Sequence, residues 1–151
     1  MRSKAVQLVF AVVALFTGAA AEELLPKALG VGFPVLLAFS LFADVRGPSA
    51  KAVLFAVAAG AMEDAICSLP WATSIGFFSA LALASRWSKA PMAFVPIAFP
   101  CFQLWLWLWR PDLNGSVFSR FLVAIPVGLA TAAAAFPLLR WAERTVAIDE
   151  E

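Results

Sequence analysis

Six apolar segments, separated by short polar breaks, constrain this chain more than any other feature. They predict helices over approximately 5–21, 28–43, 49–67, 69–86, 90–109 and 117–141. The composition agrees, because 63% hydrophobic and 14% charged residues leave too few polar side chains to cover a soluble globule of 151 residues. Several apolar stretches are shorter than the roughly 20 residues that cross a ~30 Å hydrocarbon core, so the second, third and fourth must take in flanking residues or lie in thinned bilayer. The sequence therefore predicts one all-α domain over 1–151, a polytopic membrane bundle of about six transmembrane helices.

The basic residues predict the orientation of this bundle, since cytoplasmic loops retain Lys and Arg. With six spans and a cytoplasmic N-terminus, the inner side holds eight basic residues: Arg2, Lys4, Arg46, Lys51, Arg86, Lys89, Arg140 and Arg144. The outer side holds three: Lys27, Arg110 and Arg120. Tryptophans fall at both boundaries, with Trp87 and Trp141 inside and Trp71, Trp105, Trp107 and Trp109 outside. Both termini are therefore predicted to be cytoplasmic.

The N-terminal segment has a second interpretation. Arg2 and Lys4, an apolar run over 5–16 and small residues over 18–21 have the layout of a secretory signal cleaved before Glu22. We favour a retained first helix that carries Glu22 and Glu23 at its outer end, because the six-span orientation is self-consistent.

An acidic pair, Glu63 and Asp64, ends the apolar stretch of the third helix. A carboxylate at a helix centre in a bilayer costs about 2.5 to 3.5 kcal/mol, so an acid at membrane depth is a candidate functional or packing site. Asp64 is either a helix-end acid hydrogen-bonded to the start of the next helix, or a buried acid that carries a proton, binds a solute or anchors a partner helix. Glu63 points about 100° away on the same helix and is expected to be solvated or interfacial.

Small residues form a stripe on the same helix, because Ala52, Ala56, Gly60 and Asp64 recur every four residues. A similar stripe on the sixth helix comprises Gly128, Thr131 or Ala132, and Ala135. Small side chains let helix backbones approach closely. We therefore expect the third and sixth helices to make the tight helix contacts.

The residue types argue against a catalytic, cofactor-binding or metal site. The chain has no histidine, which removes imidazole ligands and every Ser-His or Cys-His arrangement. Cys67 and Cys101 lie in apolar surroundings without CxxC spacing and are expected to be free buried thiols. The net charge of +1 argues against a nucleic-acid partner.

The middle of the chain resembles the MreD family of rod shape-determining proteins. The resemblance rests on Pro34-Val-Leu-Leu-Ala-Phe-Ser, a short charged loop, and the stretch from Phe55 to Ser68 that contains Gly60-Ala-Met-Glu-Asp64. In that family a proline opens the second helix and a Gly-x-x-x-Asp pattern closes the third, usually followed by Ser-Gly and then Leu-Gly. Pro34, Gly60 and Asp64 match this pattern, and Ser68 stands in for the serine. The chain departs from it where Leu69-Pro70-Trp71 replaces the glycine-containing turn and Ala72-Thr73 replaces Leu-Gly.

The resemblance implies a non-enzymatic scaffold without cofactors in the bacterial inner membrane. Such a scaffold binds MreC and helps to couple the cytoskeletal protein MreB to RodA and the penicillin-binding transpeptidase, which build peptidoglycan during cell elongation. Surrounded by membrane lipid, it would use the residues of the match for structure or partner contact. These candidates are Asp64, Gly60, Ala56, Pro34 and Ser68.

Two other classes of function stay open. A substrate-binding membrane subunit of an energy-coupling-factor-type transporter would also be a six-helix bundle, with an outer pocket near Asp64 and the tryptophans. An intramembrane aspartyl protease needs two facing aspartates, whereas Asp44 and Asp112 are expected in loops on opposite sides. The protease is therefore disfavoured.

Overall fold

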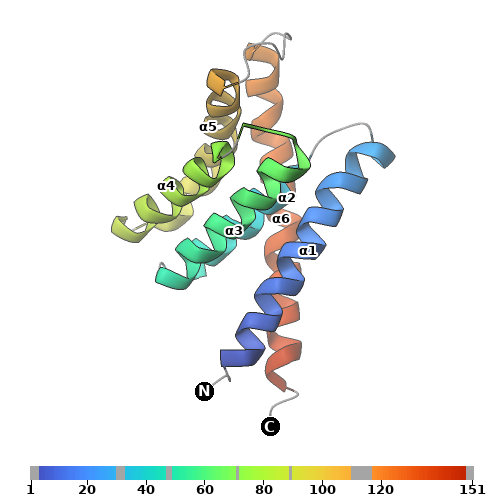
Figure 1. Cartoon of the computed structure of the whole chain (residues 1–151), viewed down its shortest axis with the longest axis vertical. Coiled ribbons are helices and arrows are strands. Elements are labelled where there is room, and N and C mark those ends of the chain that lie inside the picture. Colours follow the sequence, from blue (N-terminus) through green and yellow to red (C-terminus); the bar gives the residue numbers. More distant parts are fainter. Residues whose placement is uncertain are drawn as a thin grey trace.

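The computed structural model describes residues 4–29, 33–46, 49–70, 72–88, 90–109 and 117–148, and these ranges contain helices and no strand. The predicted all-α class is confirmed for them. Successive α-helices run in opposite directions, so the helices form an up-and-down bundle with both termini at the same end (Figure 1). The elements are α1 (Lys4–Leu29), α2 (Val35–Arg46), α3 (Ala50–Ile66), α4 (Thr73–Trp87), the 3₁₀-helix η1 (Pro91–Ala93), α5 (Phe94–Trp109) and α6 (Val117–Ile148).

The first and last helices of the chain, α1 and α6, are longer than the hydrophobic pattern predicted. The prediction ended the first helix at residue 21, but α1 continues to Leu29, and α6 continues past residue 141 to Ile148. The added residues of α1 are mostly good helix formers, and Glu23 and Lys27 form an i,i+4 ion pair there. A helix does not have to end where its apolar run ends.

The second helix is shorter than predicted and lies at the centre of the bundle. It begins at Val35, after Pro34, and not at residue 28, so α2 has only 12 residues and a length of about 18 Å. Nine of these residues are buried, and α2 contacts α1, α3, α4, α5 and α6. A helix that is apolar on all sides is expected in the interior of a bundle. The core therefore lies around α2, with Leu36, Leu37 and Ala38 fully enclosed.

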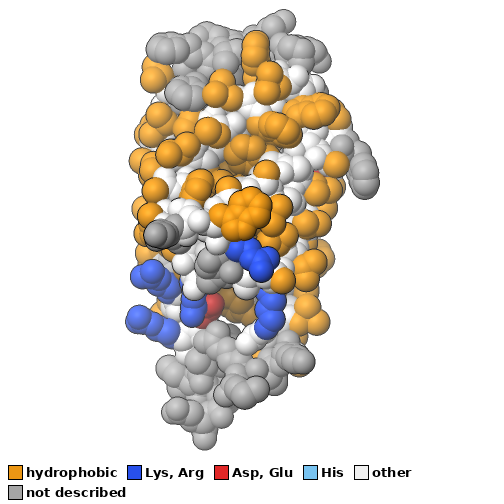
Figure 2. All heavy atoms as spheres, turned by 90° about the vertical axis from the view of Figure 1, so that its left-hand side faces the viewer, with side chains coloured by type: hydrophobic (Ala, Val, Ile, Leu, Met, Phe, Trp, Pro, Cys, Tyr) orange, Lys and Arg blue, Asp and Glu red, His pale blue; other side chains and the backbone are white. Residues whose placement is uncertain are grey.

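Two helices in the described ranges are long and apolar enough to span a membrane. They cover Ala5–Leu25 in α1 and Leu122–Thr145 in α6, and only 17% and 28% of their most apolar windows are buried. Large apolar side chains such as Phe16 and Trp141 are about two-thirds exposed. Figure 2 shows an apolar surface along most of one face, with Lys and Arg side chains gathered toward the end that carries the termini.

Both small-residue stripes lie at close helix contacts, as predicted. Gly128, Thr131, Ala132 and Ala135 are buried on α6. A Cβ atom built on Gly128 would overlap the ring of Phe99, so this side chain of α5 packs directly on the α6 backbone. The stripe on α3 contributes to the candidate site.

Candidate functional site

The α3 and α4 backbones approach each other closely at Gly60. A Cβ atom at this position would lie 2.7 Å from both Cα and N of Ile75, a distance that real Cβ atoms essentially never show. Ala56, one turn earlier on the same stripe, is fully buried. Glycine is therefore required at residue 60 for α3 to lie this close to α4, and the predicted packing role of this stripe is confirmed.

Asp64 supplies the N-terminal cap of α4 from the preceding helix. The N-cap position is Ala72, whose side chain cannot accept a hydrogen bond. Instead, Oδ1 of Asp64 accepts from the backbone N–H of Ser74 at 2.7 Å, and Oδ2 accepts from that of Ile75 at 3.5 Å. A carboxylate there satisfies amides that have no partner within the helix and interacts favourably with the helix dipole. Of the two readings of Asp64, the structure shows the hydrogen bond to the next helix.

The turn between these helices has a strained backbone. The N–H of Leu69 bonds to the carbonyl of Asp64 at 3.0 Å, and Ser68 has a φ of 50°. This is the geometry of a Schellman ending, in which the left-handed position is usually glycine. Ala72 is also left-handed, with a φ of 68°. Ser68 is exposed at this turn, so its side chain is accessible, unlike Asp64 and Ala56.

Glu22 caps the start of α2, as Asp64 caps the start of α4. Its Oε2 accepts from the backbone N–H of Leu36 at 3.0 Å. The carbonyl of Pro34 accepts from Ala38 at 3.1 Å, so the matched proline stands at the start of α2. Two helix starts are thus capped by acids from other helices.

Glu63 lies between these two caps, and its predicted solvated or interfacial position is wrong. Its side chain is buried, with 4% of the residue exposed, because α3 is covered by α1 on one side and by α4 on another. The thiol of Cys67 donates to Oε1 of Glu63 at 3.5 Å. The carboxyl groups of Glu22 and Glu63 lie close enough to interact with each other.

We call Glu22, Glu63, Asp64 and Cys67 the acid cluster. Within the described ranges no group of three or more His, Cys, Asp or Glu side chains is arranged to hold a metal ion. The acids bind backbone amides and interact with each other, so the cluster joins α1, α2, α3 and α4 at one end of the bundle. The geometry of the cluster therefore indicates a structural role, in which it holds these helices together.

Trp105 extends this end of the bundle to α5. Its indole N–H donates to the carbonyl of Thr73 at 2.8 Å, and its ring lies 6.2 Å from that of Phe77. The prediction treated Trp105, Trp107 and Trp109 alike as interface anchors. Trp107 and Trp109 are 43% and 52% exposed, whereas Trp105 is half-buried and packs against α4.

Three other sequence predictions need correction or fall outside the described ranges. The cysteines are free, as expected, but Cys67 and Cys101 are exposed and not buried. Asp44 is not in a loop but fully buried in α2, with neither carboxylate oxygen hydrogen-bonded to a described residue. The predictions for Arg2, Trp71, Lys89, Arg110 and Asp112 lie outside the described residues.

Comparisons with known proteins do not assign a family. No family model, no curated protein and no solved structure matches the chain. The evidence on function therefore comes from the sequence and from the geometry above.

Proposed function

We propose that this chain is a multi-pass protein of the bacterial inner membrane that acts as an MreD-like, non-enzymatic scaffold. In this proposal it binds MreC and links MreB to RodA and the penicillin-binding transpeptidase during cell elongation. The observation that carries the proposal is the joint between α3 and α4. Gly60 and Asp64, the residues of the family pattern, provide its close backbone contact and its helix cap.

Membrane insertion of the whole bundle is supported by its surface. The long helices α1 and α6 expose apolar side chains along their length. The described basic side chains Arg46, Lys51, Arg86, Arg140 and Arg144 belong to helix ends on the terminal side of the bundle, whereas Lys27 lies near the opposite end of α1. This asymmetry is expected of a protein whose termini are cytoplasmic. The short α2 is compatible with a bilayer because the surrounding helices shield its ends from lipid.

A scaffold role suits the way in which the acid cluster is satisfied. Asp64 and Glu22 accept hydrogen bonds from the backbone amides at helix starts, so they fix the relative positions of α2, α3 and α4. Asp64, Gly60 and Ala56 are buried and cannot themselves touch a partner protein. In the proposal they act indirectly, by setting the shape of the outer surface that MreC reads, including the exposed turn at Ser68.

Co-purification tests this function. The tagged full chain is expressed with the MreC of the same organism, extracted from membranes in mild detergent and purified. We expect MreC to be retained by the wild type and by Asp64→Asn, which keeps an acceptor for the α4 amides, and to be lost with Asp64→Leu. The control Glu23→Gln removes an exposed acid beside Glu22 and should retain MreC. A wild-type chain that never retains MreC, or an Asp64→Leu chain that retains it fully, would overturn the proposal.

The transporter-subunit alternative makes a different prediction. It requires a solute pocket near Asp64 and the tryptophans, whereas the cavity of about 470 Å³ lies at the opposite end, near Arg46 and Lys51. Tight binding of a vitamin-like solute by the purified chain, without retention of MreC, would favour this alternative.

A further inference from the structure

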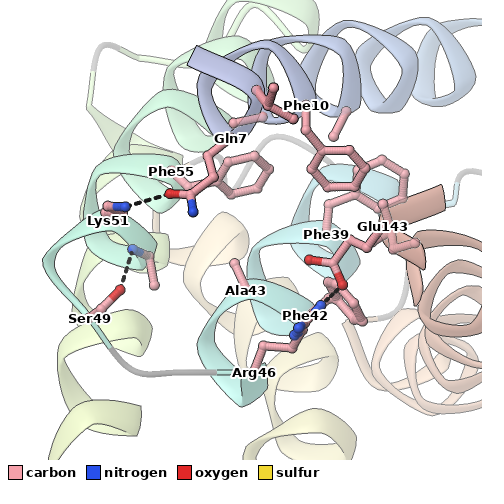
Figure 3. Close-up of a pocket in the computed structure, with 15 residues that line it drawn as sticks. Gln7, Phe10, Phe39, Phe42, Ala43, Arg46, Ser49, Lys51, Phe55 and Glu143 are labelled. Atoms are coloured by element: carbon pink, nitrogen blue, oxygen red, sulfur yellow. Dashed lines mark hydrogen bonds and ion pairs between the residues drawn. The ribbon is translucent and has the colours of Figure 1, made fainter. Parts of the chain in front are cut away.

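A cavity of about 470 Å³ lies at the end of the bundle that carries both termini. Its size is within the range of about 300 to 1,000 Å³ that is typical of small-molecule sites. Residues of α1, α2, α3 and α6 enclose it, and the acid cluster takes no part. The inner wall is largely aromatic (Figure 3), formed by Phe10, Phe39, Phe42 and Phe55.

The rim of this cavity is polar and joins the four helices in pairs. Nζ of Lys51 donates to Oε1 of Gln7 at 2.6 Å, which links α3 to α1. Arg46 forms an ion pair with Glu143, which links α2 to α6. Figure 3 shows the two pairs on either side of the space, with Ala43 between them.

The described rim side chains carry a net positive charge. Among the described residues, Glu143 offsets one cation, Arg46, whereas Lys51 donates to the neutral amide of Gln7. The rim also includes Ser49, the N-cap of α3, whose Oγ accepts from the N–H of Ala52. The positive end of the α3 dipole therefore lies at the rim as well. An anionic group would be attracted there, directly beside an apolar wall.

We propose that this cavity binds an anionic phospholipid of the inner leaflet. Its phosphate would lie between Lys51 and Arg46, and part of an acyl chain would lie against the four phenylalanines. Basic pockets between membrane helices on the cytoplasmic side are suited to anionic headgroups. A free phosphate would leave the aromatic wall unused. The inference rests on the membrane insertion in the proposed function, but it does not depend on MreC.

Native mass spectrometry of the full chain in detergent tests this proposal, with thermal unfolding as a second readout. The added probes are phosphatidylglycerol, phosphatidylcholine and inorganic phosphate. The wild type should retain one phosphatidylglycerol and gain thermal stability from it. Lys51→Gln should weaken this binding about fivefold, since one basic residue near an anionic headgroup contributes about 1 kcal/mol. Arg86→Gln removes a cation from the same end of the bundle but outside the cavity, and should bind like the wild type.

Filling the cavity provides a test that is independent of charge. Ala43→Phe projects a ring into the space and should abolish retention of the lipid while the lipid-free protein stays folded. Ala11→Leu, from the opposite wall in α1, serves if the first variant does not fold. The proposal is overturned if phosphatidylcholine binds equally well, if inorganic phosphate stabilises as much as the lipid, or if Arg86→Gln weakens binding as much as Lys51→Gln.

The outcomes separate this inference from the scaffold function. Retention of the lipid by a chain that never binds MreC would leave the lipid site standing and remove the scaffold. Retention of MreC without selective lipid binding would do the reverse.

Discussion

The two ends of the bundle use charged side chains in opposite ways. At the end that contains the α3–α4 turn, Glu22 and Asp64 are turned inward and bind the starts of α2 and α4. At the end that contains the termini, Lys51 and Arg46 surround a cavity and pair across helices at its rim. We call the first, where the acids bond within the chain, the closed end, and the second, where the cations border a cavity of about 470 Å³, the open end. The difference indicates that one end sets the architecture and the other is free to bind.

Gly60→Ala should have the largest effect on stability, because it places a side chain where the α3 and α4 backbones are in contact. The new Cβ would stand 2.7 Å from the backbone of Ile75, which cannot move away as a side chain could. We expect a destabilisation of about 3 kcal/mol, at the upper end of the usual range for overpacking. Thermal unfolding in detergent measures it.

Gly76→Ala is the matched control for this variant. Its Cβ would meet only Cζ2 of Trp105, at an ordinary 3.7 Å. Alanine has the higher helix propensity, so this variant should be unchanged or stabilised by up to about 1 kcal/mol. Equal effects of the two substitutions would show that the contact between α3 and α4 is not close.

Asp64→Leu should come next, with a loss of about 2 to 3 kcal/mol. It leaves the amides of Ser74 and Ile75 without their acceptor at a buried helix start. Asp64→Asn keeps an acceptor oxygen and should lose less than half as much. If both variants unfolded at the same temperature, the charge and not the cap would be the main contribution of Asp64.

Glu22→Ala should lower stability by about 1 to 2 kcal/mol, since it removes one cap and one partner of Glu63. Glu23→Ala removes an acid from the next position, where only an exposed pair with Lys27 is lost, and should cost about 0.5 kcal/mol or less. Unfolding of the two variants in parallel distinguishes a buried cap from surface charge. Similar losses would mean that Glu22 does not organise α2.

The smallest effect should be a gain. Ser68→Gly relieves a left-handed residue at the end of α3 and should stabilise by about 1 kcal/mol. The same change at the helical Ser79 should destabilise by a few tenths to about 1 kcal/mol, because glycine lowers helix propensity. A loss of stability with Ser68→Gly would contradict the turn geometry.

The sequence predicted the closed end better than the open one, for physical reasons. Four-residue spacing was enough to place Gly60 and Asp64 on one face of a helix, and that face is buried. Glu63 was misplaced because the prediction assumed one buried face, whereas α3 packs against helices on more than one side. Its partner Glu22 is distant in the sequence, so only the tertiary fold brings the pair together.

The sequence pattern did not predict the cavity. Its wall consists of phenylalanines on three helices, each of which looks like an ordinary core residue in its own segment. The length of α1 was also missed, because hydropathy marks the extent of an apolar run and not the end of a helix. Features that arise where several helices meet were therefore beyond the sequence pattern.

In the proposed orientation the closed end faces outward and the open end faces the cytoplasm, and cysteine labelling tests this orientation most directly. Cys67 and Cys101 are replaced by alanine, and single cysteines are introduced by Lys27→Cys, Lys51→Cys and Arg86→Cys. A maleimide that cannot cross membranes is applied to spheroplasts before and after permeabilisation. We expect Lys27→Cys to be labelled in intact spheroplasts, and Lys51→Cys and Arg86→Cys to be labelled only after permeabilisation. Labelling of Lys51→Cys or Arg86→Cys from the outside, or protection of Lys27→Cys until permeabilisation, would contradict this orientation.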